Sequence, residues 1–342
     1  MPTFLKKYEK VMKEYRNSGI DINPVFYDSP EQNYRMRVEY NLIKKNGNLE
    51  FSEFSKETLN RASKSIYLIA ELLLEYINSI EVLKNKLFRL DFISNQKGEI
   101  VMTMIYHKEI NDEWKKQANS LKEKFKINII GQSKKKKIVL GNEYVIEDIH
   151  LLKKTLKYKY SYGIFTQPNS IINQKMLNWV IESTKNIDGD LLELYCGCGN
   201  FTIALSENFD KILGSEIVKK SIVDAKYNIE LNDINNVEFV RMSSQEIELA
   251  FNNSREFNRL PSKQIKKYNF NTVLVDPPRS GLTDDVIKFI KNFKTIIYIS
   301  CNPETCLRDI IKLDTHKIIN SALFDQFPGT DHIESGFILN KI

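Results

Sequence analysis

One cysteine stands at a junction between two structural signals. Cys301 directly follows the apolar run 295–300 and is followed by Asn302 and Pro303. The run is typical of a buried strand, while Asn302 is a favourable N-cap and Pro303 suits the first position of a helix. A thiol beside a helix N-terminus feels the positive end of the helix dipole, which favours the reactive thiolate. We therefore interpret Cys301 as a nucleophile, with a small buried side chain as the alternative, and Cys306 as a core residue.

A second group of chemically capable residues follows another apolar run. Asp276 and Arg279 flank two prolines in the segment "DPPRSG", residues 276–281. The prolines remove two backbone donors and hold the chain extended, so that Asp276 and Arg279 project from a strand end. A D-P-P segment also occurs in methyltransferases that act on exocyclic amines, where an aromatic residue usually follows. Arg279 in that place argues against amine methylation, and a structural turn is the alternative.

A glycine loop follows the first apolar run of the second half. Gly197 and Gly199 allow a sharp turn and a close approach of the backbone to a ligand, and Asn200 follows them. Glu216 lies nineteen residues after Gly197 at the end of the next apolar run, where a carboxylate can accept both hydroxyls of a ribose. Thr202 replaces the third glycine of a dinucleotide fingerprint. The loop suits a ligand with a ribose and no pyrophosphate, and we predict S-adenosylmethionine; an ordinary glycine turn is the alternative.

A nucleophilic cysteine beside a methyl donor indicates a definite reaction. Carbon 5 of uracil is too weak a nucleophile to take a methyl group directly, but thiolate addition at carbon 6 turns it into an enolate carbon that can. A base must then remove the proton from carbon 5 before the thiolate leaves. Glu334 or His332 is available for this step. The alternative for both is a solvated strand start.

The elements that hold these residues alternate between strand and helix from about residue 165. Strands are expected at 190–196, 211–217, 237–242, 271–276 and 295–300, with a final pair near 317–326 and 333–340. β-branched strands that alternate with helices indicate an α/β fold with a doubly wound, mostly parallel, Rossmann-like sheet. Ligands of such sheets bind at the carboxyl ends of the strands. The candidate residues all follow strand ends, so we expect them to share one crevice in a domain over 161–342.

Residues 1–160 show an α+β pattern and a different charge. Strands are expected at 34–43, 87–94 and 99–107, and helices at 57–83 and 111–125. This half carries 30 Lys and Arg against 21 Asp and Glu, whereas the remainder carries 20 against 23. Such a charge asymmetry is expected when one part binds a polyanion and the other part catalyses a reaction on it. We predict an RNA-binding domain over 1–160, with a solvated lysine-rich face as the alternative; the phosphate contacts would come from Lys134, Lys135, Lys136 and Lys137. Arg279 of the second half is a further expected contact with the RNA substrate.

An aromatic pair in the first half could receive RNA bases. If Lys97 and Gly98 form a two-residue hairpin loop, Phe88 lies directly opposite His107 on one face of two strands. An aromatic and an imidazole ring together make a stacking platform for bases. The alternative is that Phe88 belongs to the core.

Composition excludes several other classes of protein. The 342 residues are 42% hydrophobic and 27% charged, as in globular proteins with room for two domains. The longest apolar stretch, 65–77, contains two glutamates, so we expect no membrane span, and no signal peptide opens the sequence. The four cysteines lie in C-x-C and C-x₄-C pairs that fit zinc poorly. We expect a cytoplasmic protein with free thiols and no metal.

Motifs along nearly the whole chain resemble the tRNA (uracil-5-)-methyltransferase family. They are "YRMRVEY", "IYHKEINDEW", "FTQPN", "LLELYCGCGNF", "REFNRL", "VDPPRSGL", "YISCNPET", "LFDQFP" and "HIESG". The resemblance implies a class I methyltransferase that uses S-adenosylmethionine and methylates uridine 54 in the T loop of tRNA. It implies that Cys301 is the nucleophile and Glu334 the proton acceptor, and that Phe88 and His107 contact the substrate. The cofactor contacts that it implies are Gln167, Tyr195, Asn200, Glu216 and Asp276.

Two alternatives to this function stay open. Relatives that methylate ribosomal RNA usually carry an extra N-terminal barrel and a four-cysteine iron–sulfur site, and no cysteine precedes Cys196 here. That difference favours tRNA over ribosomal RNA. A protein whose main work is to remodel tRNA, with methylation secondary, would use the same basic surface.

Overall fold

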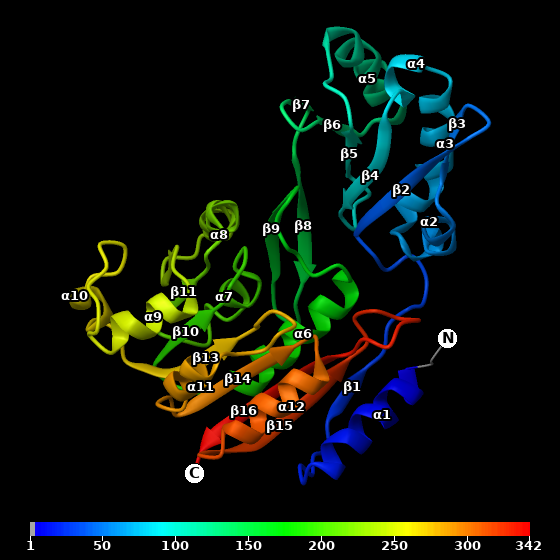
Figure 1. Ribbon diagram of the computed structural model, residues 1–342. Coiled ribbons are helices and arrows are strands. Elements are labelled where there is room, and N and C mark those ends of the chain that lie inside the picture. The colour runs from blue at the N-terminus through cyan, green and yellow to red at the C-terminus, as the bar shows by residue number, and fades with distance from the viewer. Residues whose placement is uncertain (1–3) are drawn as a thin grey trace.

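The computed structural model describes residues 4–342, which form two parts linked by a long two-stranded ribbon (Figure 1). Each part is built on its own sheet, and the ribbon runs between them. The ribbon pairs β8 (Tyr144–His150) with β9 (Thr155–Ser161) in antiparallel register. No helix among the described residues is long and apolar enough to cross a membrane.

The upper part in Figure 1 contains a six-stranded sheet in the order β3-β2-β4-β5-β6-β7. Its strands are β2 (Arg37–Lys45), β3 (Asn48–Phe51), β4 (Leu87–Ser94), β5 (Ile100–Tyr106), β6 (Asn128–Gln132) and β7 (Lys137–Leu140). Its helices are α2 (Glu53–Glu57), the 3₁₀ turn η1 (Leu59–Arg61), α3 (Lys64–Asn78), α4 (Glu81–Lys84) and α5 (Asp112–Phe125). Only β5 and β6 are parallel, because α5 forms the crossover between them. This is the α+β arrangement expected from the sequence.

Two local predictions in this part are wrong. The expected helix over 57–83 is interrupted, because the backbone around Arg61 and Ser63 hydrogen-bonds to Arg35 instead of continuing a helix. The hairpin loop is longer than Lys97 and Gly98, since Ser94 pairs with Ile100 and the register is one residue off the expected one. A bulge between Leu87 and Arg89 shifts the register by one more residue and leaves Phe88 as the extra residue of β4.

The lower part contains an eight-stranded sheet in the order β1-β15-β16-β14-β13-β10-β11-β12. The strands are β1 (Val25–Tyr27), β10 (Asp190–Leu194), β11 (Ile212–Ser215), β12 (Val237–Val240), β13 (Phe270–Val275), β14 (Thr295–Ser300), β15 (His316–Phe324) and β16 (Glu334–Lys341). All neighbours are parallel except for β16, which runs antiparallel to β14 and β15. The predicted Rossmann-like, mostly parallel sheet is therefore confirmed.

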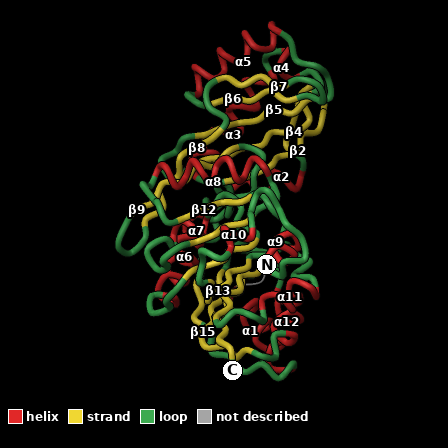
Figure 2. The backbone as a smooth tube through the Cα atoms, turned by 90° about the vertical axis from the view of Figure 1, so that its left-hand side faces the viewer, coloured by secondary structure: helices red, strands yellow, loops and turns green. Residues whose placement is uncertain are grey.

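Helices cover this sheet, as the side view in Figure 2 also shows. They are α1 (Phe4–Asn17), α6 (Ser170–Thr184), α7 (Asn200–Ala204), α8 (Lys219–Leu231), α9 (Ser244–Phe251), α10 (Ser262–Ile265), α11 (Asp284–Ile290) and α12 (Pro303–Lys312). Two buried clusters pack against the two faces of the sheet, and alternate residues of one strand divide between them: Leu191 joins one cluster and Leu192 the other.

The N-terminal segment packs with the second sheet, although the sequence analysis expected residues 1–160 as one domain. Strand β1 hydrogen-bonds to β15, with Val25 opposite Ala322. Helix α1 buries Val11, Met12 and Tyr15 in a cluster that includes residues of β14 and β16. The chain therefore starts at the eight-stranded sheet, passes through the six-stranded sheet and returns.

Candidate active site

The ends of three adjacent strands bring the predicted reactive groups together. In β14 and β16, Ser300 is the register partner of Ser335, so Cys301 and Glu334 are the neighbouring residues at the same end of this strand pair. On the other side of β14, Val275 of β13 pairs with Tyr298, so Asp276 emerges at the same edge. Cys301 is half-buried and Glu334 is only 4% exposed. The sheet thus places a thiol between two carboxyl groups.

The start of α12 fixes the position of Cys301. The Asn302 side chain accepts a hydrogen bond from the backbone N–H of Glu304 at 3.2 Å, which is the expected N-cap, and Pro303 occupies the first turn. Asn302 and Thr305 also donate from their side chains to the carbonyl of Arg279, at 3.0 and 3.1 Å. The helix start therefore holds the D-P-P-R segment in place. Cys306, inside α12, is fully buried as predicted.

The protonation of the thiol differs from the expectation. Burial, followed by the Glu334 and Asp276 carboxyls, raises the pKa of Cys301 to about 11, and Arg279 offsets only part of this. Burial also raises the pKa of Asp276 to about 7, and burial with the Asp276 charge raises the pKa of Glu334 well above its ordinary value. The expected thiolate is therefore not the resting form, because these surroundings outweigh the helix dipole. At neutral pH these surroundings favour the thiol form of Cys301.

The structure distinguishes the two candidate bases. His332 Nε2 lies 3.0 Å from Arg279 Nη2, and since a guanidinium only donates, that ring nitrogen accepts and its lone pair is engaged. Burial and the Arg279 charge also lower the pKa of His332. Glu334 Oε2, in contrast, is buried without a hydrogen-bond partner among the described residues. Of the two candidates, Glu334 is therefore the one with an oxygen that no other described group occupies.

A cavity of about 390 Å³ opens beside Cys301. Cys301, Arg279 and His332 line it, together with residues at the start of α12 and lysines of α1. The cavity is large enough to hold an extruded base beside the thiol.

The glycine loop after β10 has the conformation that its sequence predicts. Gly197 and Gly199 have φ of +56° and +85°, and Tyr195 has φ of +62°, which is unusual for a residue with a side chain. The Glu216 carboxylate, at the end of β11, accepts from the N–H of Gly197 at 3.2 Å and of Val218 at 2.7 Å. Strained backbone at a strand end is typical of a ligand site.

The space around this loop fits a nucleoside. A Cβ at Gly197 would meet nothing within 4 Å, whereas one at Gly199 would lie 2.8 Å from Phe239. The open side of the loop is therefore at Gly197, beside the Glu216 carboxylate, which has lone pairs left for ribose hydroxyls. The residues present fit S-adenosylmethionine as the sequence predicted.

The remaining predicted cofactor residues are held by partners of their own. The amides of Asn200 and Asn173 pair reciprocally at 2.8 and 2.9 Å. Gln167 accepts from Gln326 at 2.6 Å, and the Tyr195 hydroxyl lies 2.7 Å from that of Ser244. Their contacts with a cofactor stay predictions.

The two cysteines of the glycine loop are buried, and the described residues offer no metal site. Cys196 and Cys198 are buried free thiols whose pKa values burial raises. Residues 4–342 hold no group of three or more His, Cys, Asp or Glu arranged to bind a metal.

The RNA contacts predicted in residues 1–160 lie in the part built on the six-stranded sheet, away from the ends of β13, β14 and β16. The rings of Phe88 and His107 stack with centroids 3.9 Å apart at 12°. Phe88 is half-buried and lies outside the core cluster that contains Leu90 and Phe92, so it is not a core residue. In the lysine run, Lys134 and Lys135 are exposed, whereas Lys137 forms an ion pair with Glu143.

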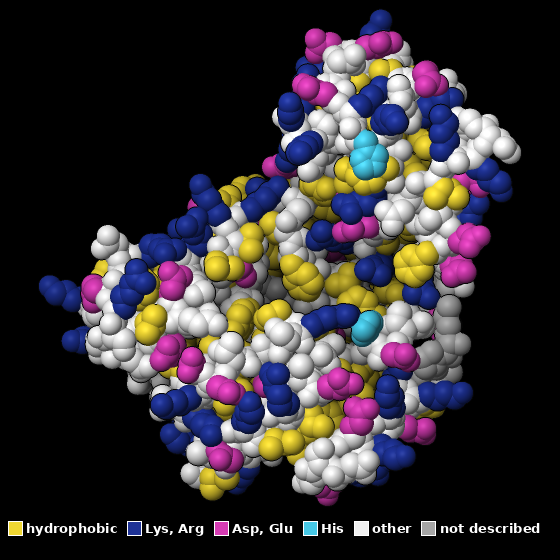
Figure 3. Space-filling model, viewed as in Figure 1, with side chains coloured by type: hydrophobic (Ala, Val, Ile, Leu, Met, Phe, Trp, Pro, Cys, Tyr) yellow, Lys and Arg dark blue, Asp and Glu magenta, His cyan; other side chains and the backbone are white. Residues whose placement is uncertain are grey.

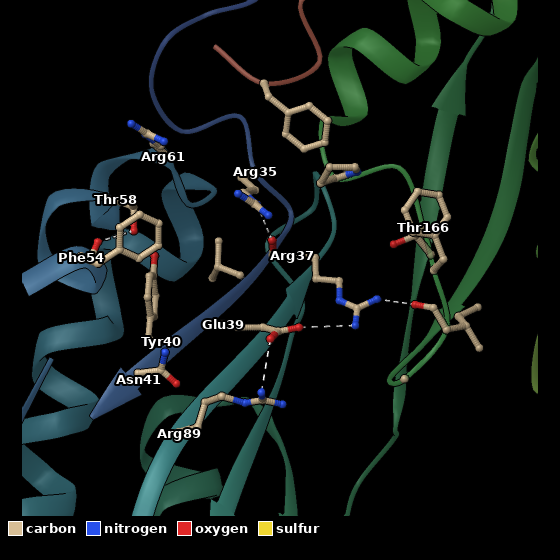
Figure 4. A pocket seen from close by; sticks show the side chains of 16 residues that line it. Arg35, Arg37, Glu39, Tyr40, Asn41, Phe54, Thr58, Arg61, Arg89 and Thr166 are labelled. Atoms are coloured by element: carbon tan, nitrogen blue, oxygen red, sulfur yellow. Dashed lines mark hydrogen bonds and ion pairs between the residues drawn. The ribbon is translucent and has the colours of Figure 1, made fainter. Parts of the chain in front are cut away.

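The sequence analysis missed a cleft of about 690 Å³ between the two parts (Figure 4). Arg35, Arg37 and Arg89 line it, with Arg37 and Arg89 both paired to Glu39 at 3.7 and 3.4 Å. Exposed aromatic rings stand on its two walls, Phe54 from α2 and Phe165 from the segment before α6. Figure 3 shows Lys and Arg side chains beside hydrophobic ones around this hollow. Arg35, Arg37 and Glu39 are spaced two residues apart in the sequence. In a strand this spacing places side chains on one face, so it could have revealed this charged wall.

Comparisons with known proteins agree with this geometry. The family described as tRNA (Uracil-5-)-methyltransferase matches residues 3–342. A tRNA/tmRNA (uracil-C(5))-methyltransferase of Aliivibrio fischeri is 43% identical over 331 residues, which cover 92% of this chain and 90% of the relative. One of Nitratiruptor is 43% identical over 327 residues, covering 94% and 90%.

A solved structure shares the fold. It is the tRNA (uracil-54, C5)-methyltransferase of Pyrococcus abyssi in complex with S-adenosyl-L-homocysteine, with a TM-score of 0.73 and 22% identity, covering 98% of this chain and 82% of that one. The family match spans the chain, and the curated relatives exceed 40% identity. The chain therefore belongs to the tRNA (uracil-5-)-methyltransferase family, whose reaction is S-adenosylmethionine-dependent methylation of carbon 5 of uracil in tRNA.

Proposed function

We propose that this protein methylates carbon 5 of uridine 54 in the T loop of tRNA, through a covalent bond between Cys301 and carbon 6 of the uracil. The observation that carries the proposal is the placement of Cys301 and Glu334 at neighbouring ends of β14 and β16, beside a cavity. A nucleophile and a proton acceptor on rigid strands are what this chemistry requires.

The reaction that we infer uses these two residues in sequence. The Cys301 thiol gives its proton to water, and its sulfur bonds to carbon 6, which moves the π electron pair of the C5–C6 double bond onto carbon 5 and the uracil O4. S-adenosylmethionine supplies the methyl group that carbon 5 takes. Glu334 then accepts the proton of carbon 5, and the electron pair of that bond expels the Cys301 thiolate. Because its pKa is raised, Glu334 must release its own proton before this step, and the carboxylate that results is a stronger base than an exposed one.

Several surfaces support an RNA substrate. The arginine-lined cleft between the parts carries Phe54 and Phe165 at exposures of 71% and 66%, and exposed aromatic rings are what unstacked bases bind. A T-loop uridine is stacked in tRNA, so it must be extruded to reach Cys301. The stacked pair Phe88 and His107 could hold neighbouring bases while this happens.

The names of similar proteins support the same substrate. Relatives above 40% identity are named for tRNA and tmRNA, and the Pyrococcus enzyme for uracil 54. We accordingly infer tRNA as the main substrate and tmRNA as a second one. Ribosomal RNA stays the alternative substrate, and tRNA remodelling the alternative function.

The test is methyl transfer from labelled S-adenosylmethionine to separate pools of tRNA, tmRNA and ribosomal RNA. We expect label in tRNA, and its loss when cytidine replaces uridine 54. With 5-fluorouridine RNA, the protein should form an adduct that survives denaturation, because fluorine cannot leave as a proton does. Cys301→Ala should form none, while Cys306→Ala, which removes a thiol outside the cavity, should form it normally. An adduct that persists in Cys301→Ala would show that Cys301 does not form the covalent bond to RNA.

A further inference from the structure

The loop between β15 and β16 carries the proposed proton acceptor. Residues 325–333 make this connection, and Glu334 follows immediately. The carbonyl of Phe327 accepts from the backbone N–H and the hydroxyl of Thr330, at 3.3 and 2.8 Å, and that hydroxyl accepts from the N–H of His332 at 3.3 Å. These bonds shape the turn, but they do not tie it to the rest of the protein.

One side chain from α1 contacts the loop at three places. Lys7 is 3% exposed, and its ammonium donates to the Asp325 carboxylate and to the carbonyls of Phe327 and His332, at 3.0 and 3.1 Å for the carbonyls. An ammonium has three N–H groups, so its donors are fully used. The three acceptors lie at the start, the turn and the end of the loop. The ammonium therefore ties three points of the loop to α1, in addition to the contacts of Gln326 with Gln167 and of His332 with Arg279.

Helix α1 is a firm support for this cation. Val11 and Met12 are buried in the core of the catalytic part, and the ring of Tyr15 packs 5.6 Å from that of Phe337 in β16. Lys6 and Lys10 on the same helix are exposed and line the outer wall of the cavity at Cys301. Lys7 alone of these three points under the loop.

We propose that Lys7 is a positioning residue of the methylation reaction, which holds the β15–β16 loop so that Glu334 is aimed at carbon 5 of the bound uracil. This deepens the proposed function and rests on Glu334 as the proton acceptor. His332 lies two residues before Glu334, so loss of its carbonyl contact releases the loop close to the reacting carboxyl. A displacement of about 1 Å at a reacting group can lower a rate by about a hundredfold.

The test compares two substitutions that break the same ion pair. Lys7→Met removes the charge and both carbonyl contacts, whereas Asp325→Asn leaves Lys7 able to donate to both carbonyls. We expect Lys7→Met to lower kcat by about tenfold to a hundredfold with little change in KM for tRNA, and Asp325→Asn to have a much smaller effect. Lys7→Met should also accumulate the covalent adduct with ordinary tRNA, because proton removal is the step that is slowed.

Two further variants separate positioning from folding. Lys13→Met removes an exposed lysine of the same helix and should behave as the unmodified protein. The double variant Lys7→Met/Asp325→Asn leaves no unpaired buried charge, so it should melt near the temperature of the unmodified protein and still turn over slowly. A double variant that folds and turns over normally would overturn the proposal, as would equal losses of kcat in Lys7→Met and Asp325→Asn.

Failure of this inference can be told from failure of the proposed function. If the unmodified protein forms no adduct with 5-fluorouridine RNA, the covalent mechanism itself is wrong. If it forms that adduct and Glu334→Gln accumulates adduct with ordinary tRNA, but Lys7→Met does not, only the role of Lys7 is wrong.

Discussion

Two regions proposed to act on RNA differ in how their side chains work. The crevice at the ends of β13, β14 and β16 depends on buried ionisable groups, whereas the platform of Phe88 and His107 depends on ring surfaces open to a ligand. In the crevice, burial raises the pKa values of Cys301, Asp276 and Glu334, so small shifts in position change their chemistry. On the platform, His107 is exposed and Phe88 half-buried, so these residues can act only through contact with a ligand. We therefore expect changes in the crevice to alter reaction steps, and changes on the platform to alter binding.

The largest effect is expected for Glu334→Gln. The variant should still bond to RNA and transfer the methyl group, but turnover should fall by about a hundredfold to ten-thousandfold because proton removal fails. Gel analysis under denaturing conditions should show protein bound to ordinary tRNA. Glu304→Gln, at an exposed glutamate on the wall of the same cavity, is the control and should turn over normally. Normal turnover by Glu334→Gln, with stalling by His332→Ala, would identify His332 as the base.

Changes on the platform should weaken RNA binding and leave the chemistry intact. Phe88→Ala and His107→Ala should each raise the Kd for tRNA by an amount equivalent to roughly 1–3 kcal/mol per lost base stack. Because the two rings stack on each other, their effects should be less than additive in the double variant. Single-turnover methylation at saturating tRNA should be nearly unchanged. If Phe88→Ala melts the protein and His107→Ala is silent, the platform lies elsewhere.

Buried acids of the catalytic part should make its stability depend on pH. Burial raises the pKa of Glu193 from near 4.5 to about 8, so between these values the folded protein binds a proton that the unfolded chain releases. The free energy of unfolding should accordingly fall as pH rises from 5 to 8, by at most about 1.4 kcal/mol per pH unit for one such group. Urea unfolding at several pH values measures this slope. Glu193→Gln should make it shallower, whereas Glu9→Gln, at an exposed position, should not; an unchanged slope in Glu193→Gln would contradict this account.

The smallest effects are expected in the lysine run. Lys134→Ala and Lys135→Ala should each lower affinity for all RNAs alike and reduce the dependence of affinity on salt by about one phosphate contact. Lys137→Ala should do less, because Lys137 already pairs with Glu143. If any of these variants loses its preference for particular RNA sequences, the substituted lysine contacts a base and not a phosphate.

Local signals in the sequence were sufficient for the strand ends and the helix start. Asn302 and Pro303 define the beginning of α12 through contacts within a few residues, so the position of Cys301 could be predicted. Strands 270–275 and 295–300 were also clear, since buried parallel strands are continuous apolar runs. The candidate catalytic site could therefore be located from sequence.

What could not be predicted depends on partners distant in the chain. The raised pKa of Cys301 comes from Glu334 and Asp276 as well as burial, and none of these is visible near residue 301. The bulge at Phe88 depends on how two strands pair, and no residue type announces it. Lys7 resembles any other lysine of a surface helix until its three acceptors are seen.

The pairing of β1 with β15 has a consequence for how the protein is made. Val25 lies beside Ala322, so this contact joins segments separated by nearly the whole chain. During synthesis the first segment must wait for almost every later residue, and until then the unpaired β1 segment can pair with other chains. Contacts of such long range slow folding, because their loops must close before they stabilise anything. We expect the six-stranded sheet to fold early, and the methylation site, which needs α1 from one end and Glu334 from the other, to be the last region to become complete.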